Sequence, residues 1–101
     1  MQPMQLHYLS FETTDEGGDV GAWDAVACVS PDRVAAVQAE VDVVLGWIGH
    51  HIGQGPAPLD EGGLWDMEQS RWPEDGRVTL TLTITGPMAL GLELARAFQW
   101  D

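Results

Sequence analysis

The chain has no lysine, only four arginines and a single cysteine, Cys28, in 101 residues. One cysteine excludes an intramolecular disulfide framework, and so little positive charge argues against nucleic-acid binding, which depends on neutralising phosphates. No apolar run approaches the roughly 20 residues of a membrane-spanning helix, and no charged-then-apolar leader precedes the first predicted strand. We therefore expect a cytoplasmic protein that binds neither nucleic acid nor membrane.

Acidic residues are abundant instead. Sixteen Asp and Glu give a formal net charge of −12, while 45% hydrophobic residues are enough to build a core, so we expect one domain over residues 1–101. The acids cluster in predicted loops and along strands, where they either keep the protein soluble or form an acidic docking surface for a basic protein. The residues predicted to form that surface are Asp15, Glu16, Asp19, Asp24, Asp60, Glu61, Asp66 and Glu68.

The alternation of side chains and the turn residues predict four strands and two helices. The clearest strand is 78–85, in which apolar residues alternate with threonines; 4–12, 23–29 and 64–72 are weaker, and the last is polar enough for a sheet edge. Ser30-Pro31-Asp32 predicts the start of a helix that ends between Gly49 and Gly53, and Pro87 opens a second helix to about Trp100.

This order, β-β-α-β-β-α, predicts a two-layer α+β fold with a four-stranded, mainly antiparallel sheet and two helices on one face. A strand order of 1-2-4-3 makes neighbours antiparallel and places strand 4 inside the sheet; 2-1-4-3 is the alternative, because the first strand is also apolar. The other face carries the threonine row together with Asp24, Asp66 and Glu68, so it is predicted to be polar, acidic and open.

The sequence offers little for catalysis or metal binding. It has no nucleophile elbow, phosphate-binding loop or dinucleotide motif, and one cysteine with three histidines shows no zinc-ligand spacing. Cys28 has no flanking glycine turn or helix start to activate it, His7 is expected in the core, and His50 and His51 suit a helix C-terminus. We expect no enzyme activity, no cofactor and no metal.

One repeat leaves an alternative open. Asp15-Glu16-Gly17-Gly18 recurs as Asp60-Glu61-Gly62-Gly63, and each copy precedes a Trp-Asp pair. The predicted topology puts both loops at the same end of the sheet, where their carboxylates would offer the oxygen ligands of a hard cation. The alternative function is thus a small-molecule- or divalent-cation-dependent enzyme, or a ligand-binding protein, with its site at the Asp15/Asp60 loop end.

The helices carry apolar residues outside their predicted core stripes. These residues predict a subunit interface on the helical layer, with Trp47 turned away from the sheet as its anchor, because Trp-centred apolar patches are typical of associating surfaces. The symmetric form is a homodimer. The alternative is that the first helix and the long loop cover them within one chain. The residues concerned are Ala36, Val43, Trp47, Leu92 and Trp100.

No stretch carries a family motif. In size and charge alone the chain is similar to small acidic accessory proteins, such as bacterial immunity proteins, secretion chaperones and phage inhibitors, which is an analogy of bulk properties. We therefore expect a non-enzymatic bacterial protein that acts by binding an unidentified protein partner, with a basic partner as the complementary one.

Overall fold

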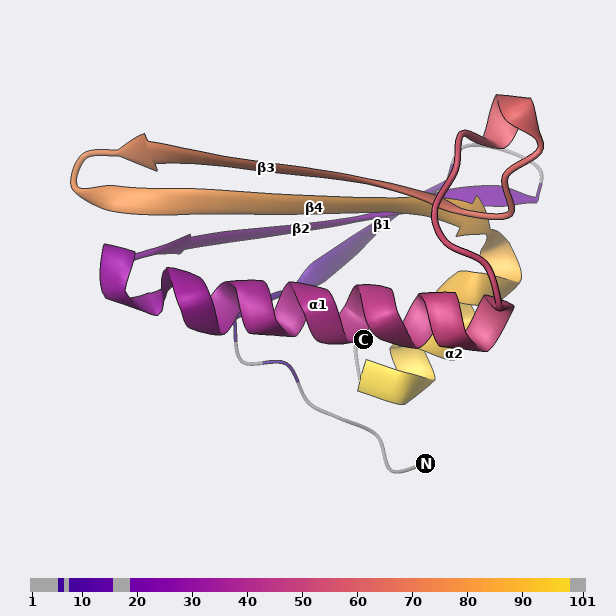
Figure 1. Ribbon diagram of the computed structural model, residues 1–101, viewed down its shortest axis with the longest axis horizontal. Helices are drawn as coiled ribbons and strands as arrows, with labels where there is room; N and C mark the ends of the chain where they lie inside the picture. Colours follow the sequence, from indigo (N-terminus) through magenta and orange to yellow (C-terminus); the bar gives the residue numbers. More distant parts are fainter. Residues whose placement is uncertain (1–5, 7, 16–18, 99–101) are drawn as a thin grey trace.

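The computed structural model describes residues 6, 8–15 and 19–98. Its elements follow the predicted order, with a short 3₁₀ turn before α1 and another before β3 (Figure 1). They are β1 (Phe11–Asp15), β2 (Val20–Val29), η1 (Pro31–Arg33), α1 (Val34–Ile52), η2 (Leu59–Glu61), β3 (Asp66–Glu74), β4 (Arg77–Pro87) and α2 (Met88–Phe98). The two-layer α+β prediction is confirmed.

The sheet has the order β1-β2-β4-β3 with every neighbouring pair antiparallel. This confirms the first predicted order and shows that the alternative, with the first strand inside the sheet, is wrong. The threonine-rich strand β4 pairs along its length with β2 on one side and β3 on the other. An uncharged strand of high β-propensity is thereby kept from exposing a free edge, while the polar strand β3 forms one border of the sheet.

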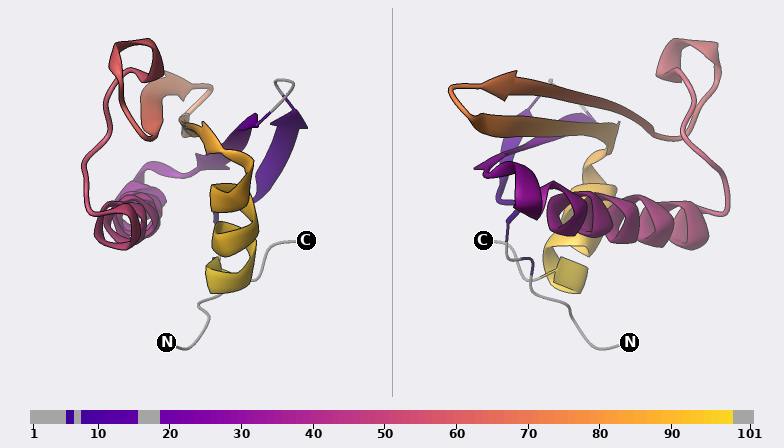
Figure 2. Two further views of the ribbon diagram at one scale, coloured as in Figure 1. Left: turned by 90° about the vertical axis from the view of Figure 1, so that its right-hand side faces the viewer. Right: turned by 60° about the vertical axis from the view of Figure 1, so that its left-hand side comes forward.

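Both helices lie on the same side of the sheet (Figure 2). The core fills the space between the layers, because one alternating set of β2 and β4 side chains points toward the helices. The pairs Trp23–Ile84, Ala25–Leu82 and Ala27–Leu80 face one another across these strands, and all six residues are buried. The helices contribute Val37, Val41, Val44, Ile48, Leu90, Leu94 and Phe98 to the same core.

The start of α1 differs from the prediction. The Ser30-Pro31-Asp32 segment forms a 3₁₀ turn closed by a hydrogen bond from the Arg33 N–H to the Ser30 carbonyl (2.9 Å), and α1 proper begins at Val34. The Ser30 hydroxyl donates to the Asp32 carboxylate (2.5 Å) instead of accepting from a helix N–H. The helix ends at Gly53, whose φ of +86° is the left-handed conformation that suits a glycine C-cap.

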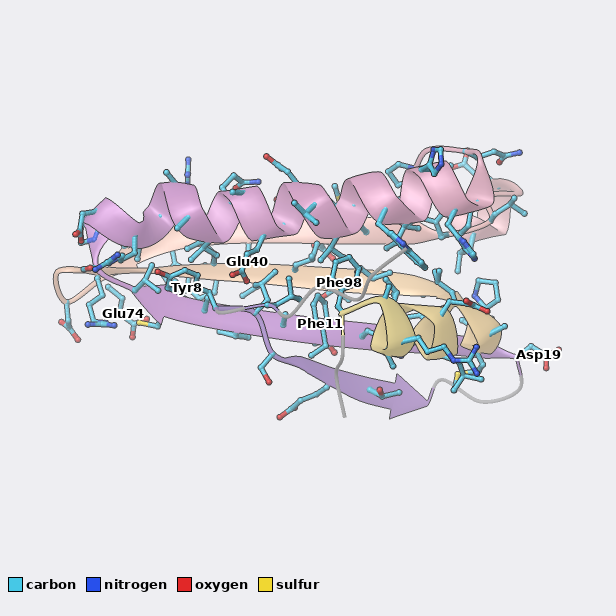
Figure 3. All side chains as sticks on the ribbon, turned by 90° about the horizontal axis from the view of Figure 1, so that it is seen from below. Tyr8, Phe11, Asp19, Glu40, Glu74 and Phe98 are labelled. Atoms are coloured by element: carbon cyan, nitrogen blue, oxygen red, sulfur yellow. The ribbon has the colours of Figure 1, made fainter. Side chains whose placement is uncertain are left out.

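The first strand lies later in the chain than predicted. β1 begins at Phe11, and the preceding segment is bound to α1 (Figure 3). The backbone N–H of Tyr8 donates to the Glu40 carboxylate oxygens Oε1 (3.0 Å) and Oε2 (3.3 Å), and the N–H of Leu9 donates to Oε1 (3.1 Å). The Glu40 carboxylate therefore accepts hydrogen bonds from backbone N–H groups of the segment that was predicted to belong to the first strand.

The prediction that Trp47 faces away from the core is wrong. Its indole packs edge-on against Phe98 of α2 (5.9 Å between ring centroids) and stacks on His51 (4.6 Å), and it is half-buried against the core. Trp47 lies on the flank of α1 rather than opposite the core stripe, and a large ring on that flank reaches the second helix. Its apolar surface is thus largely used within one chain.

Neither α1 nor α2 combines the length and the hydropathy that a helix needs to cross a bilayer.

Candidate functional site

The face of the sheet that points away from the helices is ordered in rows that run across the strands. The register places Cys28, Thr79 and Trp72 in one row, and Val26, Thr81 and Ser70 in the next. The third row is Asp24, Thr83 and Glu68, which Glu12 of β1 extends, and the fourth is Ala22, Thr85 and Asp66. We call this set of residues the open face, since neither helix covers it (Figure 1).

One half of the open face is acidic. Glu12 and Glu68 are exposed, and Asp24 and Asp66 are half-buried. The Thr83 hydroxyl donates to the Asp24 Oδ1 (2.6 Å), which holds that carboxylate beside β4. The acids come from β1, β2 and β3, so the sheet register, not their spacing in the sequence, brings them together.

The other half of the open face has no charged residue in its two rows and combines two exposed apolar side chains with three hydroxyl residues. Val26 is 58% exposed and Trp72 is 42% exposed, whereas Thr79 between Cys28 and Trp72 is buried. The Trp72 indole N–H donates to the Glu74 Oε2 (3.3 Å), which leaves the ring itself available for contact. This face was predicted to be polar and acidic. The alternation of the second strand places Val26 on it beside Asp24, but the exposed apolar surface that Val26 and Trp72 form there was not predicted.

The thiol of Cys28 lies in this half of the open face and is exposed. Its pKa is held below the ordinary value by hydrogen bonding with Thr79 and with Arg77, whose positive charge also favours the thiolate. The Arg77 guanidinium in addition donates to the Cys28 carbonyl oxygen (2.9 Å), which anchors the arginine beside the thiol. Local sequence around Cys28 does not reveal this activation, because Arg77 lies 49 residues away along the chain.

The predicted acidic docking residues are partly brought together. Asp24, Asp66 and Glu68 lie on the open face, and exposed Asp19 precedes β2 at the same end of the sheet. Asp60 and Glu61 are exposed in η2 at that end as well. The Glu16 position and the Asp15 side chain lie outside the described residues, so their part in this surface stays a prediction.

Of the two Asp-Glu-Gly-Gly copies, the second lies in and just after η2, whereas only the backbone of Asp15 in the first is among the described residues. The end of β1 and the segment η2 lie at the same end of the molecule but at opposite edges of the sheet (Figure 2), as the order β1-β2-β4-β3 requires. Within the described residues, no group of three His, Cys, Asp or Glu side chains is placed to hold a metal ion.

The predicted interface residues on the helices have unequal positions. Leu92 is 73% exposed, Val43 is 39% exposed and Ala36 is exposed, so these three are available to another molecule. Trp47 is engaged with Phe98, as described above, and Trp100 falls outside the described part of the chain. An interface on the helical layer remains a prediction for the first three.

A groove that the sequence analysis did not predict runs between β3 and the N-terminal half of the helical layer. It consists of two neighbouring hollows of about 230 and 340 Å³ that share Arg71. The first is lined by Gln38, Val41, Gln69, Ser70, Arg71, Leu80 and Thr81, and the second by Pro31, Val34, Arg71, Trp72, Pro73 and Val78. We call these two hollows the β3 groove.

Comparison of the chain with models of protein families, with curated proteins and with solved structures gave no match.

Proposed function

We propose that this protein is a non-enzymatic binding protein whose open face receives a basic protein partner, in the manner of a bacterial accessory, immunity, chaperone-like or inhibitor protein. The observation that supports this most directly is the division of one uncovered sheet face into an acidic half and an uncharged half with two exposed apolar side chains. A sheet face that meets only water is mainly polar, whereas exposed Val26 and Trp72 beside a row of acids combine the apolar and charged groups of an interaction surface.

The two halves have different physical roles in such an encounter. The acids, together with a net charge of −12, attract a basic protein over about one screening length and raise the rate of encounter. Trp72 and Val26 then supply apolar area that is removed from water on contact, and Trp is among the residues that most often carry binding energy. Because Cys28 is an exposed free thiol, we place this activity in a reducing cytosol.

Site-specific photo-crosslinking in cells tests the proposal. A photoreactive phenylalanine analogue placed at Val26 should capture a protein of basic composition, whereas the same group at Gly46, an open position on α1, should not. Capture at Val26 should fall several-fold in the double variant Glu12→Gln/Glu68→Gln, because two open-face charges are lost.

The matched control removes two charges from the helical layer instead, in the variant Asp42→Asn/Glu93→Gln, and should leave capture unchanged. Capture from Gly46 alone, or equal loss in both double variants, would count against the open face as the binding surface. Purified complexes should dissociate as salt is raised, since exposed charge pairs are screened.

A further inference from the structure

The strand β3 has a free edge that points into the β3 groove. The turn after it, Asp75–Gly76, has positive φ at both residues (+51° and +77°), which is the two-residue hairpin turn that matches strand twist. In such a hairpin the flanking pair, Glu74–Arg77, exchanges both hydrogen bonds, and bonded and non-bonded pairs alternate from there. Gln69 and Arg71 therefore direct their backbone N–H and C=O groups away from β4.

Two neighbours support this assignment. Pro73 has the same parity as Gln69 and Arg71, and an edge strand tolerates proline where the N–H would point outward. The outward N–H of Met67 is bonded to the carboxylate of its own neighbour, Asp66 (2.8 Å). In the described part of the chain, no backbone–backbone hydrogen bond joins the outward N–H and C=O groups of Gln69 and Arg71 to another element. These two residues thus offer two donors and two acceptors to an added strand.

The side chains on the two sides of this edge differ in character. Toward the open face, β3 presents Glu68 and Glu74 beside Trp72. Toward the helices, the edge borders the two hollows, whose apolar lining comes from Val41 and Leu80 in one and from Val34 and Val78 in the other. A strand laid along this edge would alternate in the same way, with basic residues opposite the acids and small apolar residues in the hollows.

We propose that β3 binds an extended segment of a basic partner protein as a fifth, antiparallel strand, with lysine or arginine on the open-face side and small apolar side chains in the β3 groove. This rests on the proposed function and specifies how the basic partner of the open face is held. A second copy of this chain fits less well, because two β3 strands paired about Ser70 would set Asp66 of each against Glu74 of the other, between chains that each carry −12.

The test uses a seven-residue peptide of alternating lysine and valine, blocked at both ends and fluorescently labelled, at low salt. In an antiparallel pair, directly opposite residues share a face, so the valines lie opposite Gln69 and Arg71 and their amides point at β3. Methylating the valine amide nitrogens should weaken binding by about tenfold, the factor expected for two modest hydrogen bonds. Methylating the lysine amide nitrogens, which point away from β3, should change binding less than about twofold.

The protein offers a matched pair of variants. Gln69→Pro removes one outward N–H without breaking a bond to β4 and should weaken binding by about threefold, the factor for one modest hydrogen bond, whereas Gln69→Thr retains the N–H and should bind like the wild type. Thermal unfolding of both variants verifies that the fold is kept.

Three results overturn strand addition: no binding of the unmodified peptide, equal binding by Gln69→Pro and Gln69→Thr, or a loss on methylating the lysine amides instead of the valine amides. If Gln69→Pro and Gln69→Thr bind the peptide equally well but Glu12→Gln/Glu68→Gln binds it more weakly, the open face remains a binding surface and only the added strand is ruled out. Failure of crosslinking at Val26 removes the proposed function independently.

Discussion

Gly91 of α2 lies directly against the indole of Trp23 on β2. A methyl group at position 91 would come within 3.0 Å of the ring atoms Cζ2, Cε2 and Nε1, closer than side-chain carbons approach one another. Trp23 is only 2% exposed and is enclosed by the sheet below it and the helix above it. The missing side chain at Gly91 therefore sets how closely α2 approaches the sheet.

The contact predicts opposite effects for two Gly→Ala substitutions in helices. Gly91→Ala should lower the free energy of unfolding by about 1–3 kcal/mol, because the new methyl overpacks against a ring that cannot move. Gly46→Ala in α1 meets no atom within 4 Å and should raise that free energy by up to about 1 kcal/mol, since alanine favours helix over glycine. Urea unfolding of both variants measures the difference, and a stabilised Gly91→Ala protein would contradict the packing described here.

Glu40 provides a second stability prediction. Glu40→Ala leaves the N–H groups of Tyr8 and Leu9 without this acceptor, and should lower the free energy of unfolding by about 1–3 kcal/mol. The amides of Tyr8 and Leu9 should also exchange with solvent faster in hydrogen-exchange measurements. Asp42→Ala, an exposed acid two residues along the same helix, should change stability by less than about 0.5 kcal/mol. Equal effects of the two substitutions would show that the carboxylate of Glu40 does not hold this segment.

Cys28 should react faster with alkylating reagents than an ordinary exposed thiol near neutral pH. Its pKa is lowered by Thr79 and Arg77, so a larger fraction is thiolate at a pH below the ordinary thiol value. Thr79→Val and Arg77→Ala should both raise the pKa and slow iodoacetamide labelling near pH 7, and the rates should converge with the wild type once pH exceeds about 9. Arg96→Ala, on α2, is the control, and a pH–rate profile shared by all four proteins would refute the assigned cause.

Association through the helical layer is tested separately from the open face. If the exposed residues on α1 and α2 form a homodimer interface, Val43→Asp and Leu92→Asp should convert dimer to monomer in light scattering with little change in unfolding. Trp47→Ala should instead lower the free energy of unfolding by at most about 3 kcal/mol, because its ring is partly buried against the core and Phe98. A wild-type protein that is monomeric at micromolar concentration would remove the dimer prediction.

The Asp15/Asp60 loop end yields a prediction about cations. Because the end of β1 and η2 lie at opposite edges of the sheet, we expect that the two loops do not bind one ion together. Calcium and magnesium at millimolar concentration should then change the melting temperature equally little. A rise in melting temperature specific to calcium would support the alternative of a cation-dependent protein.

The local pattern of the chain determined the element types and the covered face, and it limited the strand order to two alternatives, between which the structure decided. Period-two alternation in β4 separates apolar residues from threonines regardless of what surrounds them, and an uncharged strand of this kind is stable only between two others. Pro31 and Pro87 each mark the passage from a strand to a helix, because proline fixes φ and lacks an N–H. The placement of Asp24, Asp66 and Glu68 on one face followed from the same alternation.

Only the tertiary structure decided the direction of Trp47, the start of β1 and the composition of the open face. Each depends on an element distant in sequence: α2 supplies Phe98 to Trp47, and α1 supplies Glu40 to the segment before β1. The sheet register brings Val26 and Trp72 to one end of a face and the acids to the other. Helical periodicity gives the direction of a side chain around the helix axis, but it does not say which other element lies in that direction. Contacts between segments distant in the chain therefore could not be predicted from the sequence.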